Sequence, residues 1–139
     1  MRVSELTALT WDQVHLDRGA EVLDVKRLKG SQDSTHPLDT TEIRLLNALK
    51  KVSEGSRFVF VSERRGKLSP AAVQKMLERL ASAAGTNIKV HPHMLRHAAG
   101  YKFANEGKDT RSLQLWLGHR NITHTVRYSQ LSDKCFKDW

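Results

Sequence analysis

The stretch HPHMLRHAAG, from His91, places three histidines and an arginine where a helix is expected to begin. Residues three apart share one helical face, so His93 and Arg96 can reach the same ligand. A helix start also offers unpaired backbone N–H groups and the positive end of the helix dipole, both of which favour an anion. Because a guanidinium stays charged and can bind a phosphate through two hydrogen bonds, these residues indicate a phosphate site.

Two other interpretations of the same stretch remain open. His91, His93 and His97 could bind a metal ion, because imidazole is a good zinc ligand. A guanidinium beside them opposes a dication, and no cysteine or carboxylate stands next to these histidines, so no metal is expected. The cluster could also be structural, at the start of an ordinary helix.

A second candidate lies near the end of the chain, where His119 follows Gly118 and Tyr128 stands within THTVRYS. Tyrosine can act as a covalent nucleophile, although a half-buried structural aromatic is the plainer interpretation. A free phenol has a pKa near 10 and is neutral at pH 7. We expect cationic neighbours to lower the pKa of Tyr128 if it reacts.

The elements that would position these residues are mainly helical. Apolar spacing and cap signals predict helices over 3–9, 39–49, 70–84, 93–105, 110–117 and 123–128, and a small antiparallel sheet within 14–38. Residues 57–62, RFVFVS, are expected to be a strand or extended segment. The expected fold is therefore α+β, with the sheet presented from one side of a helical unit.

The helix over 70–84 is expected to be amphipathic. An apolar stripe should face the core, and it consists of Val73, Met76, Leu77 and Leu80. The opposite face should present polar side chains to a DNA groove, namely Gln74, Lys75, Glu78 and Arg79.

Length and charge narrow the class of protein. The chain has 139 residues, which suits one domain, and 23 Lys and Arg against 15 acids give a net charge of +8. That excess favours a polyanionic partner, nucleic acid first, although a merely basic protein would show it too. One cysteine excludes a disulfide within the chain. No signal peptide is expected, because the first residues lack an apolar segment, and no apolar run is long enough to span a bilayer.

The motifs together resemble a known family. RVSEL, RLKGSQDSTHPL, HMLRH, LGHRNI and TVRY follow one another in the order found in tyrosine recombinases, or phage-type integrases, and they cover nearly the whole chain. The segment from HPHMLRH to TVRY is most similar to the recombinases that invert the promoter segment of bacterial fimbrial operons. The resemblance implies a site-specific recombinase that breaks and rejoins DNA through a 3′-phosphotyrosine.

The resemblance also implies a role for each matching residue. Arg2 and Arg96 would hold the two non-bridging oxygens of the scissile phosphate, and Glu5 would orient Arg2. His119 would hydrogen-bond the phosphate, and Arg120 of the same motif would contact DNA. Such cationic groups can replace the Mg²⁺ that many nucleases use, so no cofactor is expected.

Three more residues would carry the bond-breaking chemistry. Tyr128 would attack the phosphate. Lys29, on the turn between two strands, would protonate the departing 5′-oxygen. His93 would act in proton transfer.

The family pattern further implies a helix before Arg2 and an N-terminal domain, neither of which this chain shows. We therefore expect residues 1–139 to be a single catalytic domain of an N-terminally shortened chain, monomeric in solution. The full-length parent should form a homotetramer on double-stranded DNA in the bacterial cytoplasm, away from membranes. The alternatives are a non-catalytic DNA-binding fragment or regulator, relaxation of supercoils as by type IB topoisomerases, and, more distantly, a metal-dependent hydrolase.

Overall fold

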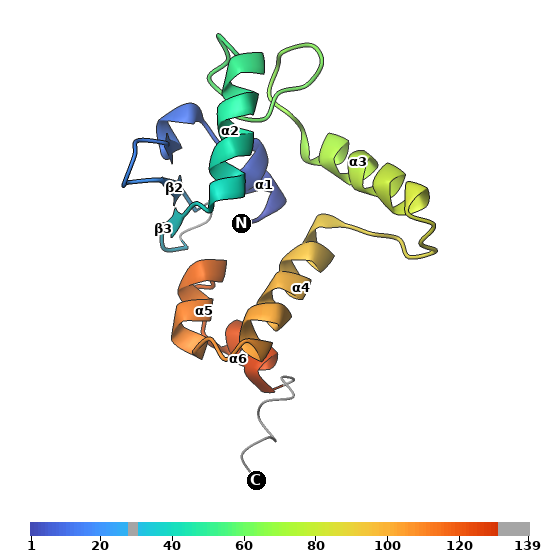
Figure 1. Ribbon diagram of the computed structural model, residues 1–139. Coiled ribbons are helices and arrows are strands. Elements are labelled where there is room, and N and C mark those ends of the chain that lie inside the picture. The colour runs from blue at the N-terminus through green and yellow to red at the C-terminus, as the bar shows by residue number, and fades with distance from the viewer. Residues whose placement is uncertain (28–30, 131–139) are drawn as a thin grey trace.

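The structure is a computed structural model that describes residues 1–27 and 31–130 (Figure 1). Lys29 lies outside the described residues. The elements, in chain order, are α1 (Val3–Thr7), the 3₁₀-helix η1 (Trp11–Gln13), β1 (Val14–His15), β2 (Val22–Val25), β3 (Ser34–Pro37), α2 (Thr40–Val52), α3 (Pro70–Ala83), α4 (Pro92–Asn105), α5 (Thr110–Leu117) and α6 (Thr123–Gln130). The predicted α+β fold, mainly helical with a small antiparallel sheet, is confirmed.

The three strands form an antiparallel sheet in the order β1-β2-β3. β2 is the central strand, with Leu23 opposite Val14 in β1 and Val25 opposite Ser34 in β3. Residues 57–62 are not a strand of this sheet. They form only isolated bridges outside it, Phe58 with Thr10 and Val61 with Lys67. A first hydrophobic core has Leu9, Val14 and Val59 as its buried members, with partly buried side chains from β2 and α2 packed against them.

The predicted helix starts for α2 and α3 are confirmed because their caps are local. Asp39 Oδ1 accepts a hydrogen bond from the backbone N–H of Glu42 at 2.7 Å, and Glu42 Oε2 accepts from Asp39 N–H at 2.9 Å. Ser69 Oγ accepts from the N–H of Ala72 at 3.1 Å, directly before the proline that begins α3.

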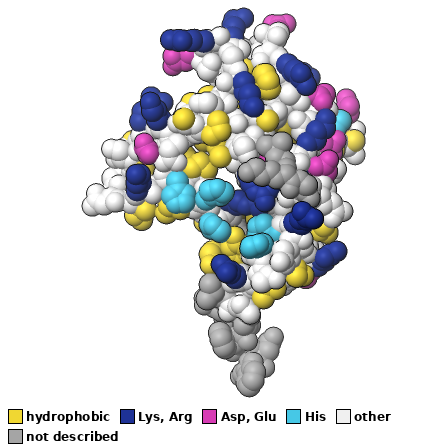
Figure 2. Space-filling view, turned by 180° about the vertical axis from the view of Figure 1, so that it is seen from behind, with side chains coloured by type: hydrophobic (Ala, Val, Ile, Leu, Met, Phe, Trp, Pro, Cys, Tyr) yellow, Lys and Arg dark blue, Asp and Glu magenta, His cyan; other side chains and the backbone are white. Residues whose placement is uncertain are grey.

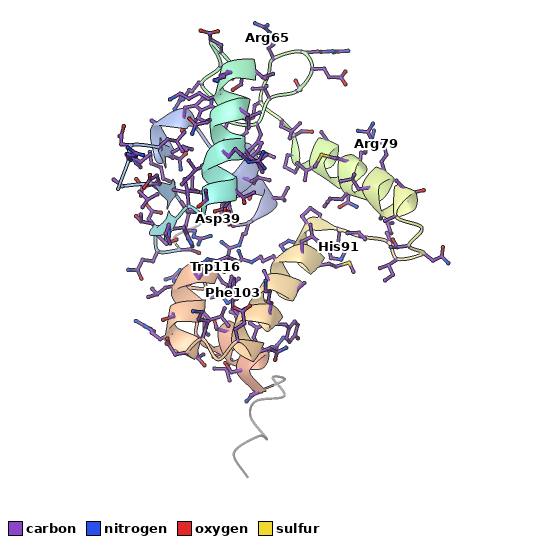
Figure 3. All side chains as sticks on the ribbon, in the orientation of Figure 1. Asp39, Arg65, Arg79, His91, Phe103 and Trp116 are labelled. Carbon is purple, nitrogen blue, oxygen red and sulfur yellow. The ribbon has the colours of Figure 1, made fainter. Side chains whose placement is uncertain are left out.

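A second core lies where α4, α5 and α6 pack together. Its buried members are Ala104, Leu113, Leu117 and Tyr128. At its edge the rings of Phe103 in α4 and Trp116 in α5 pack edge to face, with centroids 4.6 Å apart (Figure 3). The two cores are separate. We call the region between them the junction.

The core stripe predicted for α3 is confirmed for Val73 and, in part, for the half-buried Leu77, but it is wrong for the other two residues. Val73 is buried, but Met76 and Leu80 remain 42% and 58% exposed. The reason is the position of α3, which projects to one side and has its main contacts with α1 and α4 (Figure 1). Among the described residues the longest helices, α3 and α4, have 14 residues, and no helix is long and apolar enough to cross a membrane.

Candidate active site

Histidine, arginine and lysine side chains gather around a hollow on one face of the molecule (Figure 2). Two cavities open there, and Arg2 lines both. The larger, of about 730 Å³, is also lined by His119 and Arg120, and the smaller, of about 360 Å³, by His93 and Arg96. The structure therefore brings together predicted residues from the N-terminus, α4 and the segment after α5.

Arg2 is held by Glu5 at the start of α1. Glu5 Oε2 accepts the backbone N–H of Arg2 at 2.6 Å, and Oε1 accepts its guanidinium Nη1 at 3.0 Å. Burial raises the pKa of Glu5, but the hydrogen bond from Arg2 N–H and the charge of Arg27 outweigh it, and the net pKa is lowered. Glu5 is thus a buried carboxylate that stays ionised.

Arg27 also binds Glu5 and was missed by the sequence analysis. Its side chain is fully buried, and Nη1 donates to Glu5 Oε2 at 2.9 Å. A signal for it existed in the strand pattern. Arg27 lies two residues after the buried Val25, so period-two alternation places both on the inward side of the chain.

Arg96 approaches from α4 with part of its hydrogen-bonding capacity unused. Its Nη2 donates to the backbone oxygen of Leu117, at the end of α5. Its Nη1 is buried and has no partner within the described part of the chain. Burial lowers the pKa of Arg96, and the charge of Arg2 lowers it further. A buried guanidinium nitrogen with no acceptor, close to another arginine, suits an anionic ligand.

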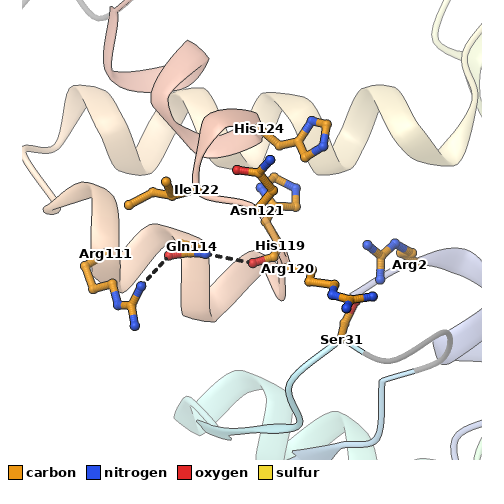
Figure 4. Close-up of a pocket in the computed structure, with 9 residues that line it drawn as sticks. All are labelled: Arg2, Ser31, Arg111, Gln114, His119, Arg120, Asn121, Ile122 and His124. Carbon is orange, nitrogen blue, oxygen red and sulfur yellow. Dashed lines mark hydrogen bonds between the residues drawn. The ribbon is translucent and has the colours of Figure 1, made fainter.

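The turn that carries His119 is built by Gln114 and Gly118. Gly118 ends α5 with φ +66°, and Gln114 Nε2 donates to the backbone oxygen of His119 at 3.0 Å. Arg111 Nη1 in turn donates to Gln114 Oε1 at 3.0 Å (Figure 4). Thr125, fully buried, bonds His119 Nδ1 at 2.9 Å and so fixes the imidazole ring. Sequence reasoning did not single out Gln114 or Thr125.

His119 is neutral at pH 7 in this structure. Burial, followed by the charge of Arg96, lowers the pKa of His119 to about 4. Because Nδ1 is taken up by Thr125, Nε2 is the ring nitrogen that can bond to a phosphate oxygen.

Tyr128 is buried in the second core and lines neither of the two cavities. Its hydroxyl lies 2.5 Å from Nδ1 of His97, and its ring stacks on that of His119 with centroids 6.2 Å apart. A Cβ added to Gly100 would come within 2.9 Å of the Tyr128 ring, so this glycine lets α4 approach the tyrosine closely.

The expected lowering of the Tyr128 pKa is wrong for this arrangement. Burial raises the pKa of Tyr128, and the opposing charge of Arg96 does not overcome it. The hydroxyl is therefore a neutral phenol hydrogen-bonded to His97.

The described residues also contain no group of three or more His, Cys, Asp or Glu that could hold a metal ion.

The four predicted DNA contacts lie in two places. Arg120 is exposed and lines the larger cavity. Lys75 and Arg79 are exposed on α3, where Arg79 points away from α4 (Figure 3). Gln74 is engaged within the chain, since its Nε2 donates to Glu78 Oε1 at 2.7 Å and to the Val90 backbone oxygen at 3.0 Å.

The chain is similar to known proteins over nearly its whole length. The model of the phage integrase family matches residues 1–134. FimE, a type 1 fimbriae regulatory protein of Escherichia coli K12, is 38% identical over 135 residues, which is 93% of this chain and 67% of FimE. The tyrosine recombinase XerA of Pyrococcus furiosus is 35% identical, over 99% of this chain and 48% of XerA.

The fold also matches a solved recombinase. A crystal structure of XerA recombinase superposes with a TM-score of 0.81 at 28% identity, over 99% of this chain and 51% of that one. The chain thus spans about half the length of that recombinase. With the family model covering nearly all of its residues, the chain belongs to the phage integrase family, the family of the tyrosine recombinases.

Proposed function

We propose that this chain cleaves and rejoins DNA by transesterification, with Tyr128 as the nucleophile. The observation that carries the proposal is the junction where Arg2, Arg96 and His119 converge. There the buried Nη1 of Arg96 has no acceptor among the described residues. The ring of Tyr128 lies nearly parallel to that of His119, with centroids 6.2 Å apart. Cationic and neutral donors at two cavities that share Arg2 suit a phosphodiester. The family membership supplies the reaction class.

The proposed cleavage step exchanges one phosphate ester for another. The Tyr128 oxygen bonds to the scissile phosphorus, the bond to the 5′-oxygen breaks, and the phenol proton leaves to a histidine. Lys29 protonates the departing 5′-oxygen. The motif resemblance assigns the proton transfer to His93, which lines one cavity with Arg2 and Arg96. In this structure the ring that contacts the phenol is that of His97, at 2.5 Å. The 3′-phosphotyrosine conserves the ester, so a 5′-hydroxyl can reverse the step without ATP.

Negative charge grows on the non-bridging oxygens during this attack, and the site is arranged to stabilise it. Arg2 and Arg96 would each donate to one oxygen, while neutral His119 donates through Nε2. Donors that are already oriented lose little free energy to reorganisation, and each contributes about 10²–10³ in rate. Since burial raises the pKa of Tyr128, the phenol loses its proton only as it attacks.

The wider biological role is also a proposal. The fimbrial-type motifs and the similarity to FimE, a fimbriae regulatory protein, support inversion of a DNA segment in the bacterial cytoplasm. Double-stranded DNA is the proposed partner, with Arg120, Lys75 and Arg79 as further contacts and Gln74 as a weaker one. The recombining form would be a homotetramer on DNA, and this chain would be its catalytic domain.

Covalent trapping tests the proposal. Nicked duplexes with a randomised centre would be incubated with the wild-type chain, and with any longer form that its gene encodes. Adducts would be recovered after SDS and phenol extraction. We expect the wild type to form adducts, Tyr128→Phe to form none while still binding DNA, and Tyr101→Phe, which removes the other tyrosine of the chain, to form them normally.

An adduct that survives in Tyr128→Phe would exclude Tyr128 as the nucleophile. No adduct with any wild-type form would favour a DNA-binding protein without catalysis. Adducts accompanied by relaxation of supercoiled DNA, but by no strand exchange, would favour the topoisomerase-like activity.

A further inference from the structure

Arg27 contacts three separate parts of the candidate site. Besides Glu5 in α1, its Nη2 donates to Ser34 Oγ in β3 at 3.0 Å and to the backbone oxygen of Trp116 in α5 at 2.8 Å. Its own backbone N–H donates to Asp33 Oδ1 at 2.7 Å. One fully buried side chain therefore ties the sheet to α1 and to the last turn of α5.

The end of α5 is shaped around this guanidinium. A Cβ on Gly118 would come within 2.5 Å of Arg27 Nε and 2.7 Å of Cζ, so glycine is required there for space as well as for its positive φ. Gly118 directly precedes His119. The backbone that carries this histidine thus rests on Arg27.

Arg27 and Arg2 also share one carboxylate. Glu5 Oε2 accepts from Arg27 Nη1 and from the backbone N–H of Arg2, while Oε1 accepts from the Arg2 guanidinium. Removal of Arg27 would leave Glu5, a buried charge, with Arg2 as its sole cationic partner among the described residues. The orientation of Glu5, and with it that of Arg2, would then be less restricted.

We propose that Arg27 is a positioning residue for DNA cleavage. It holds Arg2 and His119 in fixed positions relative to each other and does not touch the phosphate itself. The inference rests on the proposed function. Arg2 belongs to the sheet side of the site and His119 to the helical side, and Arg27 bonds directly to both sides. Lysine cannot replace it fully, because an ammonium group lacks the planar fork that reaches Glu5, Ser34 and the Trp116 oxygen at once.

The expected effect is on the rate of chemistry rather than on DNA affinity. A displacement of about 1 Å at a reacting centre can cost about 10²-fold in rate. Arg27→Lys, which keeps the charge, should therefore slow single-turnover cleavage by about 10–100-fold per folded molecule. DNA affinity should stay within about 3-fold of wild type, because the number of positive charges that release counterions is unchanged.

The experiment uses nicked duplexes that the wild-type chain has captured from the randomised pool. Arg27→Lys and Arg27→Met would be compared with Lys26→Met, a matched loss of one cation from an exposed side chain beside it. Circular dichroism and melting curves would set a temperature at which each variant is folded. Lys26→Met should cleave at the wild-type rate once bound.

A double-variant test with Arg2 distinguishes a positioning role of Arg27 from a purely stabilising one. If Arg27 acts partly through Glu5 and Arg2, the cleavage defect of Arg27→Lys should shrink clearly in an Arg2→Ala background. The defect should also be equal on an oxygen substrate and on a 5′-bridging phosphorothiolate, since leaving-group protonation is not involved.

Wild-type cleavage by folded Arg27→Lys would overturn the inference, and so would a defect of the same size in both Arg2 backgrounds. If folded Arg27→Met cleaved normally, the inference would fail as well. In each of these cases the wild-type adduct on Tyr128 would still stand, so the proposed function would survive. Absence of a wild-type adduct would instead remove the proposed function and this inference together.

Discussion

The sheet part of the molecule, residues 1–68, holds its charges at the site in pairs, whereas the helical part, residues 92–130, leaves its donors without negative partners. On the sheet side, Glu5 binds Arg2 at 3.0 Å and Arg27 at 2.9 Å. On the helical side, Arg96 bonds a backbone oxygen, and His119 bonds the neutral Thr125. Neither group meets a carboxylate within its own part.

The position of the acids explains this difference. Glu5 is the one buried carboxylate among the described residues. The helical part has only two acids, and both act elsewhere: Glu106 lies 3.8 Å from Lys102, and Asp109 caps α5. Positive charge at the junction is therefore compensated from one side only, which leaves the other side to bind an anion.

Each part thus has a distinct task in the proposed reaction. The sheet part orients cationic groups through a fixed carboxylate, and its β2–β3 segment includes Lys29, the proposed acid. The helical part supplies the nucleophile and the donors that gain an acceptor only when a phosphate arrives. A site divided in this way should respond differently to substitutions on its two sides.

The largest expected effect concerns the sheet side. Lys29→Ala should slow cleavage of an ordinary DNA strand by about 10²–10⁴, the usual range for loss of a general acid. On a strand with a 5′-bridging phosphorothiolate the sulfur leaves without a proton, so the defect should largely vanish. Single-turnover rates on both substrates give the comparison, and equal defects would show that Lys29 only binds phosphate.

On the helical side, Arg96→Ala should lose about 10²–10³ in cleavage rate through loss of one charged donor. The sulfur substrate should not rescue this variant, because the lost group stabilises the phosphate and not the leaving oxygen. Lys102→Ala, an exposed cation on the same helix, is the matched control and should cleave normally. If Arg96→Ala melts far earlier but each folded molecule cleaves at the wild-type rate, Arg96 is structural.

A smaller effect tests how the helical core holds the nucleophile. Gly100→Ala places a methyl group 2.9 Å from the Tyr128 ring, so the ring or α4 must shift. Overpacking of this kind costs about 1–3 kcal/mol in the free energy of unfolding. Urea denaturation of Gly100→Ala and of Gly66→Ala, where the nearest atom is 3.8 Å away, would measure it. Equal stability of the two variants would mean that Tyr128 is not tightly packed against α4.

Features set by local sequence were predicted well. The starts of α2 and α3 depend on caps within three residues, at Asp39 and Ser69. Motif resemblance implied that five residues lie near one another, and the structure places them at two cavities that share Arg2: His93 and Arg96 line one, and His119 and Arg120 line the other. Their roles in chemistry remain predictions.

Features set by distant contacts were not predicted. Arg27 binds the Trp116 oxygen 89 residues away, and no local pattern reveals that pairing. Periodicity correctly gave α3 an apolar face but could not show that its neighbours leave Met76 and Leu80 exposed. The pKa of Tyr128 shifts opposite to expectation because its direction depends on burial, which becomes visible only when α4 and α6 pack.

The smallest expected effect compares the two parts through one histidine in each. Burial, followed by the charge of Arg27, lowers the pKa of His36 to about 4 on the sheet side. Burial, followed by the charge of Arg96, lowers the pKa of His119 to about 4 on the helical side. In the unfolded chain both rings return to a pKa of about 6.5. Between these values the unfolded state binds more protons than the folded state, so stability must fall as the pH falls from 6.5 towards 4.

Urea midpoints measured from pH 7.5 to 4.5 would test this. The wild type should lose stability through the lower part of that range, before protonation of Glu5, whose pKa lies below its ordinary value, begins to contribute. His36→Asn and His119→Asn should each flatten the curve between pH 6.5 and 4.5, and the double variant should flatten it most. All four proteins are compared above pH 7, where neither ring takes up a proton in either state, to remove the direct cost of each substitution. A wild-type midpoint that stays constant down to pH 4.5 would show that both rings are solvated, and the neutral His119 assigned to the phosphate site would have to be replaced by a charged one.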